Sequence, residues 1–286
     1  MSQLTATFMK TAKFFIRNRA LLLGIVAWPM ALMVIMASTE LGSVSASDMP
    51  KALGALTVDM LVFALMLACV MNLPSSIARD REIGLLVKLR SMPINPGIDT
   101  LGRLLAYLAF AVVVSGLVIL LGLGLGAQFS GSAAADLEAV GFLLMAAVAA
   151  AGIGLILGSF IKSVQGTAFL GLAVTLALAF TSGILVPYNQ LSAPLQAFSR
   201  AFPISSAASS IGYLLLGQDV AGYDPLALSQ IATGIVVAVA LLAIGLVIYH
   251  RTSWRQGSAR SSSSNLGAYR RRRHHAKASA LNASSA

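Results

Sequence analysis

Six apolar runs, each long enough to cross a lipid bilayer, constrain this 286-residue chain more than any other feature. A transmembrane α-helix needs about 20 predominantly apolar residues, because its backbone polar groups must be satisfied within the helix. The runs cover residues 20–38, 52–73, 102–126, 140–161, 167–186 and 229–249. Only 10% of the residues are charged, whereas a soluble domain carries about 25%. We therefore predict an all-α polytopic membrane protein with six transmembrane helices.

The distribution of lysine and arginine predicts the orientation of these spans. With six spans, all of the 20 basic residues except Lys51 and Arg200 lie on one side of the membrane. Short loops that are rich in lysine and arginine remain in the cytoplasm. We therefore expect both termini to be cytoplasmic.

The two ends of the chain differ in character from the predicted six-span domain, which we place at residues 20–250. Residues 1–19 predict an amphipathic helix whose apolar stripe lies apart from most of its lysines and arginines, as in helices that lie in the membrane interface. The stripe consists of Leu4, Phe8, Ala12, Phe15 and Ile16. A simple extension of the first span is the alternative. Residues 251–286 predict a basic, disordered cytoplasmic tail, without a specific nucleic-acid partner.

The spans contain few groups that perform chemistry. No cluster of histidine, cysteine and acidic residues has metal-ligand spacing, and no G-x-x-x-x-G-K-[ST] motif occurs. We predict no catalytic, metal or cofactor site in this chain. Asp59 lies within the second run, where an acidic side chain could contact a cationic substrate or a proton. The alternative is that its carboxylate reaches the nearby interface or a polar neighbour.

The densest charge cluster lies in residues 77–96, "IARDREIGLLVKLRSMPINP", which we place in a cytoplasmic loop. At 100° per residue, residues 78–92 predict one short helix that ends before Pro93 and Pro96. Its broad apolar arc includes Ile83, Leu85, Leu86, Leu89 and Met92. Asp80 lies on the opposite side, and Glu82 is spaced to pair with Arg79 or Arg90. Such a surface is typical of docking to a protein partner; a juxtamembrane helix with an internal salt bridge is the alternative.

Two stretches resemble the landmarks of type-2 ABC transporter permeases. The segment "RDREIGLLVKLRSMPINP" resembles the cytoplasmic coupling-helix region of that family, with an E-x-G followed by a leucine and a proline. The segment 182–219 resembles the S-G-x-x-x-P exit from the fifth span, with a P-I-S at 203–205. The family's order of elements, from an amphipathic first helix to a long last outer loop, is similar over nearly the whole chain.

The resemblance implies one permease half of a daunorubicin-resistance-type exporter in a bacterial cytoplasmic membrane. A second half, identical or related, and a separate cytosolic ATPase that holds ATP and magnesium would be its partners. The cargo would be a hydrophobic drug, antibiotic or lipid, and residues 187–228 would form re-entrant outer helices. The implied coupling residues are Glu82, Gly84, Leu86, Leu89, Arg90 and Pro93, and the implied outer-gate residues are Ser182, Gly183, Pro187, Pro203 and Ser205. The arginine-rich tail is not a general feature of the family.

Two other functions remain open. The first is export of a polysaccharide or a lipid-linked glycan by the same fold, although aromatic residues, which stack on sugars, make up only 7% of the chain. The second is a membrane scaffold that transports nothing and docks a cytosolic protein through residues 77–96.

Overall fold

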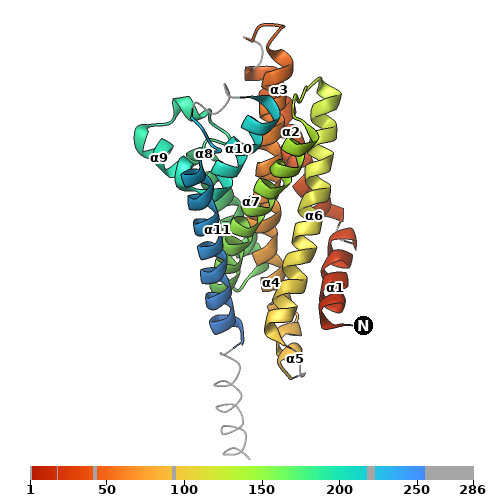
Figure 1. Ribbon diagram of the computed structural model, residues 1–286. Helices are drawn as coiled ribbons and strands as arrows, with labels where there is room; N and C mark the ends of the chain where they lie inside the picture. The colour runs from red at the N-terminus through yellow and green to blue at the C-terminus, as the bar shows by residue number, and fades with distance from the viewer. Residues whose placement is uncertain (1, 18, 41–43, 92–94, 218–222, 255–286) are drawn as a thin grey trace, which may run out of the picture.

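Helices make up almost all of the described structure (Figure 1). The computed structural model describes residues 2–17, 19–40, 44–91, 95–217 and 223–254, and no strand occurs within these residues. The elements are α1 (Gln3–Arg17), α2 (Arg19–Glu40), α3 (Met49–Met66), η2 (Leu67–Asn72), α4 (Leu73–Glu82), α5 (Leu85–Ser91), α6 (Pro96–Leu125), α7 (Ala133–Phe160), α8 (Val164–Thr181), η3 (Tyr188–Gln190), α9 (Ala193–Ala201), α10 (Pro203–Leu216), α11 (Leu228–Tyr249) and η5 (His250–Trp254). The all-helical prediction is confirmed.

Within the described residues, five helices are long and apolar enough to cross a membrane. They are Met49–Glu82, Pro96–Leu125, Ala133–Phe160, Val164–Thr181 and Leu228–Ser253. The first predicted span falls in α2, whose described apolar part, Gly24–Thr39, is shorter than these five. The chain is therefore a multi-pass membrane protein, and the sixth span stays a prediction.

A single long helix, formed by α3, η2 and α4 and here called the central helix, runs through the middle of the protein. In its most apolar window, 89% of the residues are buried. The π-helical segment η2 ends at Asn72, whose side-chain Nδ2 donates a hydrogen bond back to the carbonyl of Leu67, the first residue of the segment, at 2.8 Å. The Tyr107 hydroxyl of α6 donates to the Asn72 carbonyl at 2.8 Å. On another side, a Cβ at Gly154 of α7 would collide with the Cys69 carbonyl, so the two helices pack backbone to backbone.

The N-terminal helix α1 lies alongside the first half of α6 (Figure 1). At one end the Gln3 side chain donates to the Asn95 carbonyl at 2.8 Å, and at the other the Phe15 ring stacks on Phe110 with 4.2 Å between centroids. The buried face of α1 consists of Thr7, Thr11 and Phe15. Phe15, predicted in the interfacial stripe, therefore faces the protein core, whereas Ile16 is 71% exposed.

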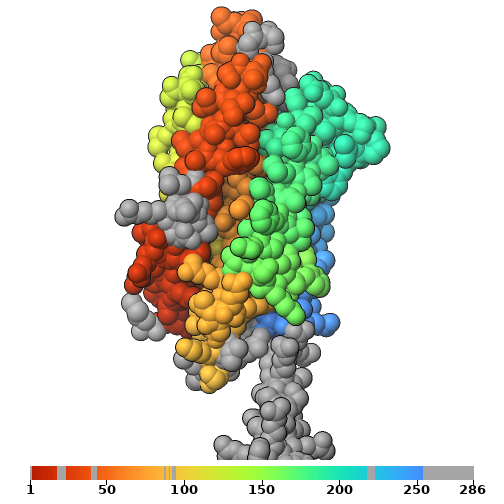
Figure 2. Space-filling view, turned by 180° about the vertical axis from the view of Figure 1, so that it is seen from behind, coloured from red at the N-terminus to blue at the C-terminus, as the bar shows by residue number. Residues whose placement is uncertain are grey.

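The segment predicted to lie between the last two spans contains η3 and the short helices α9 and α10. Proline at the second position of α9 and the first of α10 explains their starts, because its missing N–H is not needed in a first turn. These helices lie at the end of the molecule where α3 begins, far from α5 (Figure 1). From behind, α5 forms the lower tip of the described surface, between α1 and the end of α11 (Figure 2).

Candidate functional site: the charged end of the central helix

The central helix ends at a sharp turn formed by Ile83 and Gly84. Gly84 has φ +68°, a left-handed conformation that costs glycine little. The Ile83 N–H donates to the Arg79 carbonyl and the Gly84 N–H to the Arg81 carbonyl, both at 3.0 Å. The prediction of one helix over 78–92 is therefore wrong, because this turn separates α4 from α5. Residues 77–82, predicted in a loop, instead continue the central helix.

Asp80 lies at the centre of a buried ion network. Its Oδ2 accepts from Lys10 Nζ of α1 at 2.8 Å and from Arg103 Nη2 of α6 at 2.6 Å. Only 6% of Asp80 and 3% of Arg103 are exposed. The helical wheel places Asp80 opposite the apolar arc, and in the structure this side of α4 is buried because it packs against α1 and α6. A buried carboxylate remains ionised in such a place only when cations compensate its charge.

A second acidic residue balances the charge of this network. Asp99 Oδ2 lies 3.8 Å from Arg103 Nη2, one helical turn away on α6. Its Oδ1 accepts from the Thr7 hydroxyl of α1 at 3.0 Å. Two acids therefore face two bases, and both Thr7 and Lys10 fasten α1 to the network.

The other three charges at this end contact different elements, and we call residues 79–82 the RDRE segment. The Arg79 guanidinium lies 4.8 Å from the centre of the Phe14 ring on α1. Arg81 donates to the Ile161 carbonyl after α7 at 3.1 Å and to the Ser253 hydroxyl in η5 at 2.5 Å. Glu82 Oε1 accepts from the Val164 N–H at the start of α8 at 2.9 Å.

These contacts correct one of the two predicted pairings of Glu82, the one with Arg79. Among the described side chains, no ion pair joins Arg79 to Glu82; Glu82 instead caps α8, whose first N–H groups have no partner within that helix. The Arg90 side chain and Pro93 lie outside the described residues. Through the RDRE segment, four consecutive residues join the central helix to α1, α6, the α7–α8 connection and η5.

The other predicted coupling residues divide between the interior and the surface. Leu86 of α5 is 2% exposed, so this side chain anchors α5 to the bundle. Leu89 is half-buried and Lys88 is exposed. Ile83, at the turn, is 62% exposed.

Two of the predicted outer-gate residues, Ser182 and Ser205, meet in a cluster of serines. The Ser182 carbonyl accepts from the Ser199 hydroxyl of α9 at 2.6 Å and from the Ser205 hydroxyl of α10. We call Ser182, Ser199 and Ser205 the outer serine cluster. These hydrogen bonds hold the end of α8 against both short helices. Gly183 follows Ser182 and has φ +88°. Pro187 precedes η3, and Pro203 is the first residue of α10.

An apolar cavity of ≈ 380 Å³ lies between α2, the central helix and α8. Trp28, Met71 and Leu172 line it, and Asn72 and Ser75 supply its polar groups. Asp59 does not line this cavity; it is half-buried in α3.

Sequence reasoning missed Lys10, Asp99, Arg103 and Ser199. We counted Lys10 and Arg103 only as positive charges that orient the chain. The useful signal was the spacing of Asp99 and Arg103, an acid and a base four residues apart where a span begins. Ser199 had no comparable signal.

A comparison with protein families bears on this geometry. The family model described as ABC-2 type transporter matches residues 2–216. The match runs from α1 to the end of α10, so it includes the RDRE segment and the outer serine cluster. A search among curated proteins found no match.

Proposed function

The chain belongs to the ABC-2 type transporter family, and on that premise we propose that it is the permease subunit of an ATP-driven exporter. In this proposal both termini and α5 face the cytoplasm, α2 is the sixth span, and α9 and α10 re-enter the membrane from outside. A separate ATPase binds ATP and magnesium, and a second permease half, identical or related, completes the path.

The observation that carries the proposal is the set of contacts made by the RDRE segment. An ATPase that closes on ATP can move the permease only if a force at its surface reaches the spans. Ile83 and α5 supply the exposed surface, and Gly84 connects it to the central helix through one turn. The RDRE segment then passes a displacement to α1, α6, α8 and η5 through hydrogen bonds of 2.5 to 3.1 Å.

The central helix would carry this displacement toward the outer side. With 34 residues, it spans about 50 Å at 1.5 Å per residue. There the outer serine cluster holds α8 against α9 and α10, which makes these three serines the proposed gate. The apolar cavity beside Asn72 and Ser75 is within the range of about 300–1,000 Å³ for small-molecule sites. It supports a hydrophobic drug, antibiotic or lipid as cargo.

The direct test is co-purification of the tagged chain with its ATPase. We would extract the chain from native membranes in a mild detergent, identify co-eluting proteins by mass spectrometry, and measure ATP hydrolysis. Glu82→Lys places a cation beside the start of α8 and should remove the ATPase or its stimulation by cargo. The matched control is Glu138→Lys, because Glu138 is an exposed glutamate near the outer start of α7.

The two outcomes separate clearly. An ATPase that is present with the wild type and with Glu138→Lys, and lost or uncoupled with Glu82→Lys, supports the proposal. Elution of a different cytosolic protein, with no ATPase in any sample, would contradict it.

A further inference from the structure

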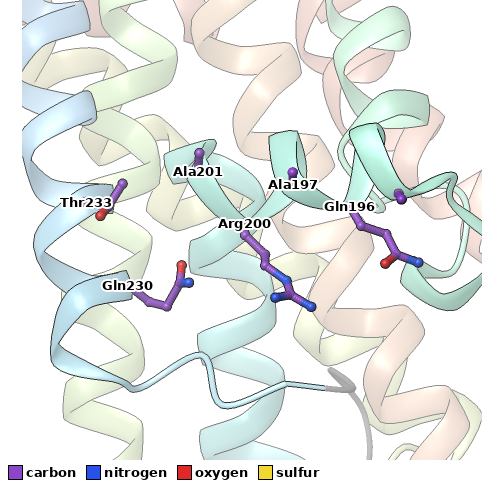
Figure 3. A pocket seen from close by; sticks show the side chains of 7 residues that line it. Gln196, Ala197, Arg200, Ala201, Gln230 and Thr233 are labelled. Carbon is purple, nitrogen blue, oxygen red and sulfur yellow. The ribbon is translucent and has the colours of Figure 1, made fainter.

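A second cavity of ≈ 380 Å³ lies between α9 and the first turns of α11 (Figure 3). In contrast to the cavity beside Asn72, its lining combines polar side chains with alanines. The lining residues are Ala193, Gln196, Ala197, Arg200, Ala201, Gln230 and Thr233. The alanines recur every fourth residue along α9, so this side of the cavity is lined by small methyl side chains.

Arg200 brings to this cavity a positive charge that pairs with no carboxylate among the described residues. Its Nε donates to the Tyr188 hydroxyl at 2.5 Å, and its guanidinium carbon lies 4.9 Å from the centre of the Tyr223 ring. Burial raises the pKa of Tyr223 above its ordinary value, so this ring does not neutralise Arg200 as a phenolate. The two rings hold the guanidinium in place and leave its charge available.

Neutral hydrogen-bonding groups surround the charge. Gln230 extends from α11 toward Arg200 (Figure 3), and within the described residues its amide makes no hydrogen bond. Gln196 is fixed on the opposite wall, where its Nε2 donates to the Leu191 carbonyl at 3.0 Å. A guanidinium beside the side-chain amide of Gln230 matches an anion with several oxygen acceptors, such as a phosphate.

The surface of α11 beyond the cavity is apolar. Ile244 lies eleven residues after Thr233 and therefore on the same side of the helix, and it is 50% exposed. Val237, which lies between them on this side, is half-buried. A lipid whose anionic head group lies beside Arg200 would therefore place its hydrocarbon chain along α11. We propose that the cavity binds the phosphate of an anionic phospholipid in the outer leaflet. The assignment to the outer leaflet rests on the topology of the proposed function.

The test measures lipid retention by the purified full-length chain. We would equilibrate it in detergent with equal amounts of phosphatidylglycerol and phosphatidylcholine and quantify bound lipid by native mass spectrometry. Phosphatidylglycerol should be retained preferentially, and Arg200→Gln should reduce its retention by about tenfold, as expected for losing a hydrogen bond to a charged group. The matched control Lys51→Gln removes the other basic residue predicted on the outer side, outside the cavity, and should change nothing.

A second variant shows whether the loss of lipid in Arg200→Gln results from the lost contact or from misfolding. Gln230→Leu leaves the stacking of Arg200 on the tyrosines intact and should reduce retention by about threefold, as for losing one neutral hydrogen bond. Equal retention by the wild type and both variants, or an equal loss in Lys51→Gln, would overturn the site.

Competition with inorganic phosphate identifies the source of the anion. If phosphate does not displace the lipid, the bilayer supplies the ligand, as proposed. If phosphate displaces it and binds the wild type but not Arg200→Gln, the site takes a soluble anion, and the lipid assignment falls. The assay uses neither an ATPase nor a cargo, so its result is independent of the proposed transport.

Discussion

Replacing Asp80 with asparagine would remove one charge from the centre of the buried network and change the side-chain volume little. The amide can still accept one hydrogen bond, but the Arg103 guanidinium then lies in the interior with only Asp99, at 3.8 Å, as its counter-ion. Lys10 also loses its partner, although its side chain is 40% exposed and water can replace the pair.

The expected cost follows from these exposures. Removing one member of a buried ion pair costs about 3–5 kcal/mol, whereas an exposed pair contributes about 0.2–1 kcal/mol. Because Asp99 still compensates part of the Arg103 charge, we expect Asp80→Asn to lower the unfolding free energy by about 3 kcal/mol. Lys10→Met should lower it by about 0.5 kcal/mol.

Thermal unfolding in detergent, followed by size-exclusion fluorescence, measures the difference. For a chain of this size, about 1 kcal/mol shifts the Tm by about 2–4 °C. Asp80→Asn should therefore lower the apparent Tm by about 6–12 °C, and Lys10→Met by about 2 °C or less.

A triple variant tests the cause of the loss. Adding Arg103→Met and Asp99→Asn to Asp80→Asn removes both remaining charges of the buried Arg103–Asp99 pair, so the triple variant should be more stable than Asp80→Asn alone. If the triple variant were less stable, or if Asp80→Asn and Lys10→Met had the same Tm, the reasoning about buried charge would be wrong.

Three further predictions concern other parts of the protein. Gly84→Ala meets no atom within 4 Å but must hold φ +68°; it should cost about 1 kcal/mol and reduce the stimulation of the ATPase by cargo. Ser205→Ala leaves Ser199 as a donor to Ser182 and should lower the Tm by about 2–4 °C, whereas Ser199→Ala with Ser205→Ala should lower it further. Asp59→Asn should change the preference between cationic and neutral cargo in a drug-resistance assay; unchanged resistance to both classes would remove Asp59 from the transport path.

The long helices could be predicted because their cause is local. A run of apolar residues must form a helix in a bilayer, and the runs at 102–126, 140–161 and 229–249 agree with α6, α7 and α11 within a few residues, except where polar turns extend the helices. The two short helices after α8 were expected only from the family resemblance, because no periodicity in residues 187–228 defines them.

The contacts of the RDRE segment could not be predicted, because they join distant parts of the chain. Lys10 is 70 residues from Asp80, and Ser253 is 172 residues from Arg81. The helical wheel failed for a different reason. It assumed a constant rotation per residue through Gly84, whose left-handed backbone changes the direction of the chain. Glu82 was predicted to pair with an arginine, but its partner in the structure is the backbone N–H of Val164, which no pattern of side chains reveals.

The π-helical segment η2 affects how the central helix tolerates insertions and deletions. A π turn holds one residue more than the α-helical geometry on either side, so Leu67–Asn72 takes up a shift of one residue in the helical frame. Deleting one residue within η2 would convert it to α-helix and leave the RDRE segment on its present face. The same deletion in α3 would rotate the charged end by about 100° and misalign all four side chains at once. Converting η2 to α-helix without a deletion would produce the same rotation. The π-helical segment therefore determines how the RDRE segment is rotated about the helix axis relative to α3.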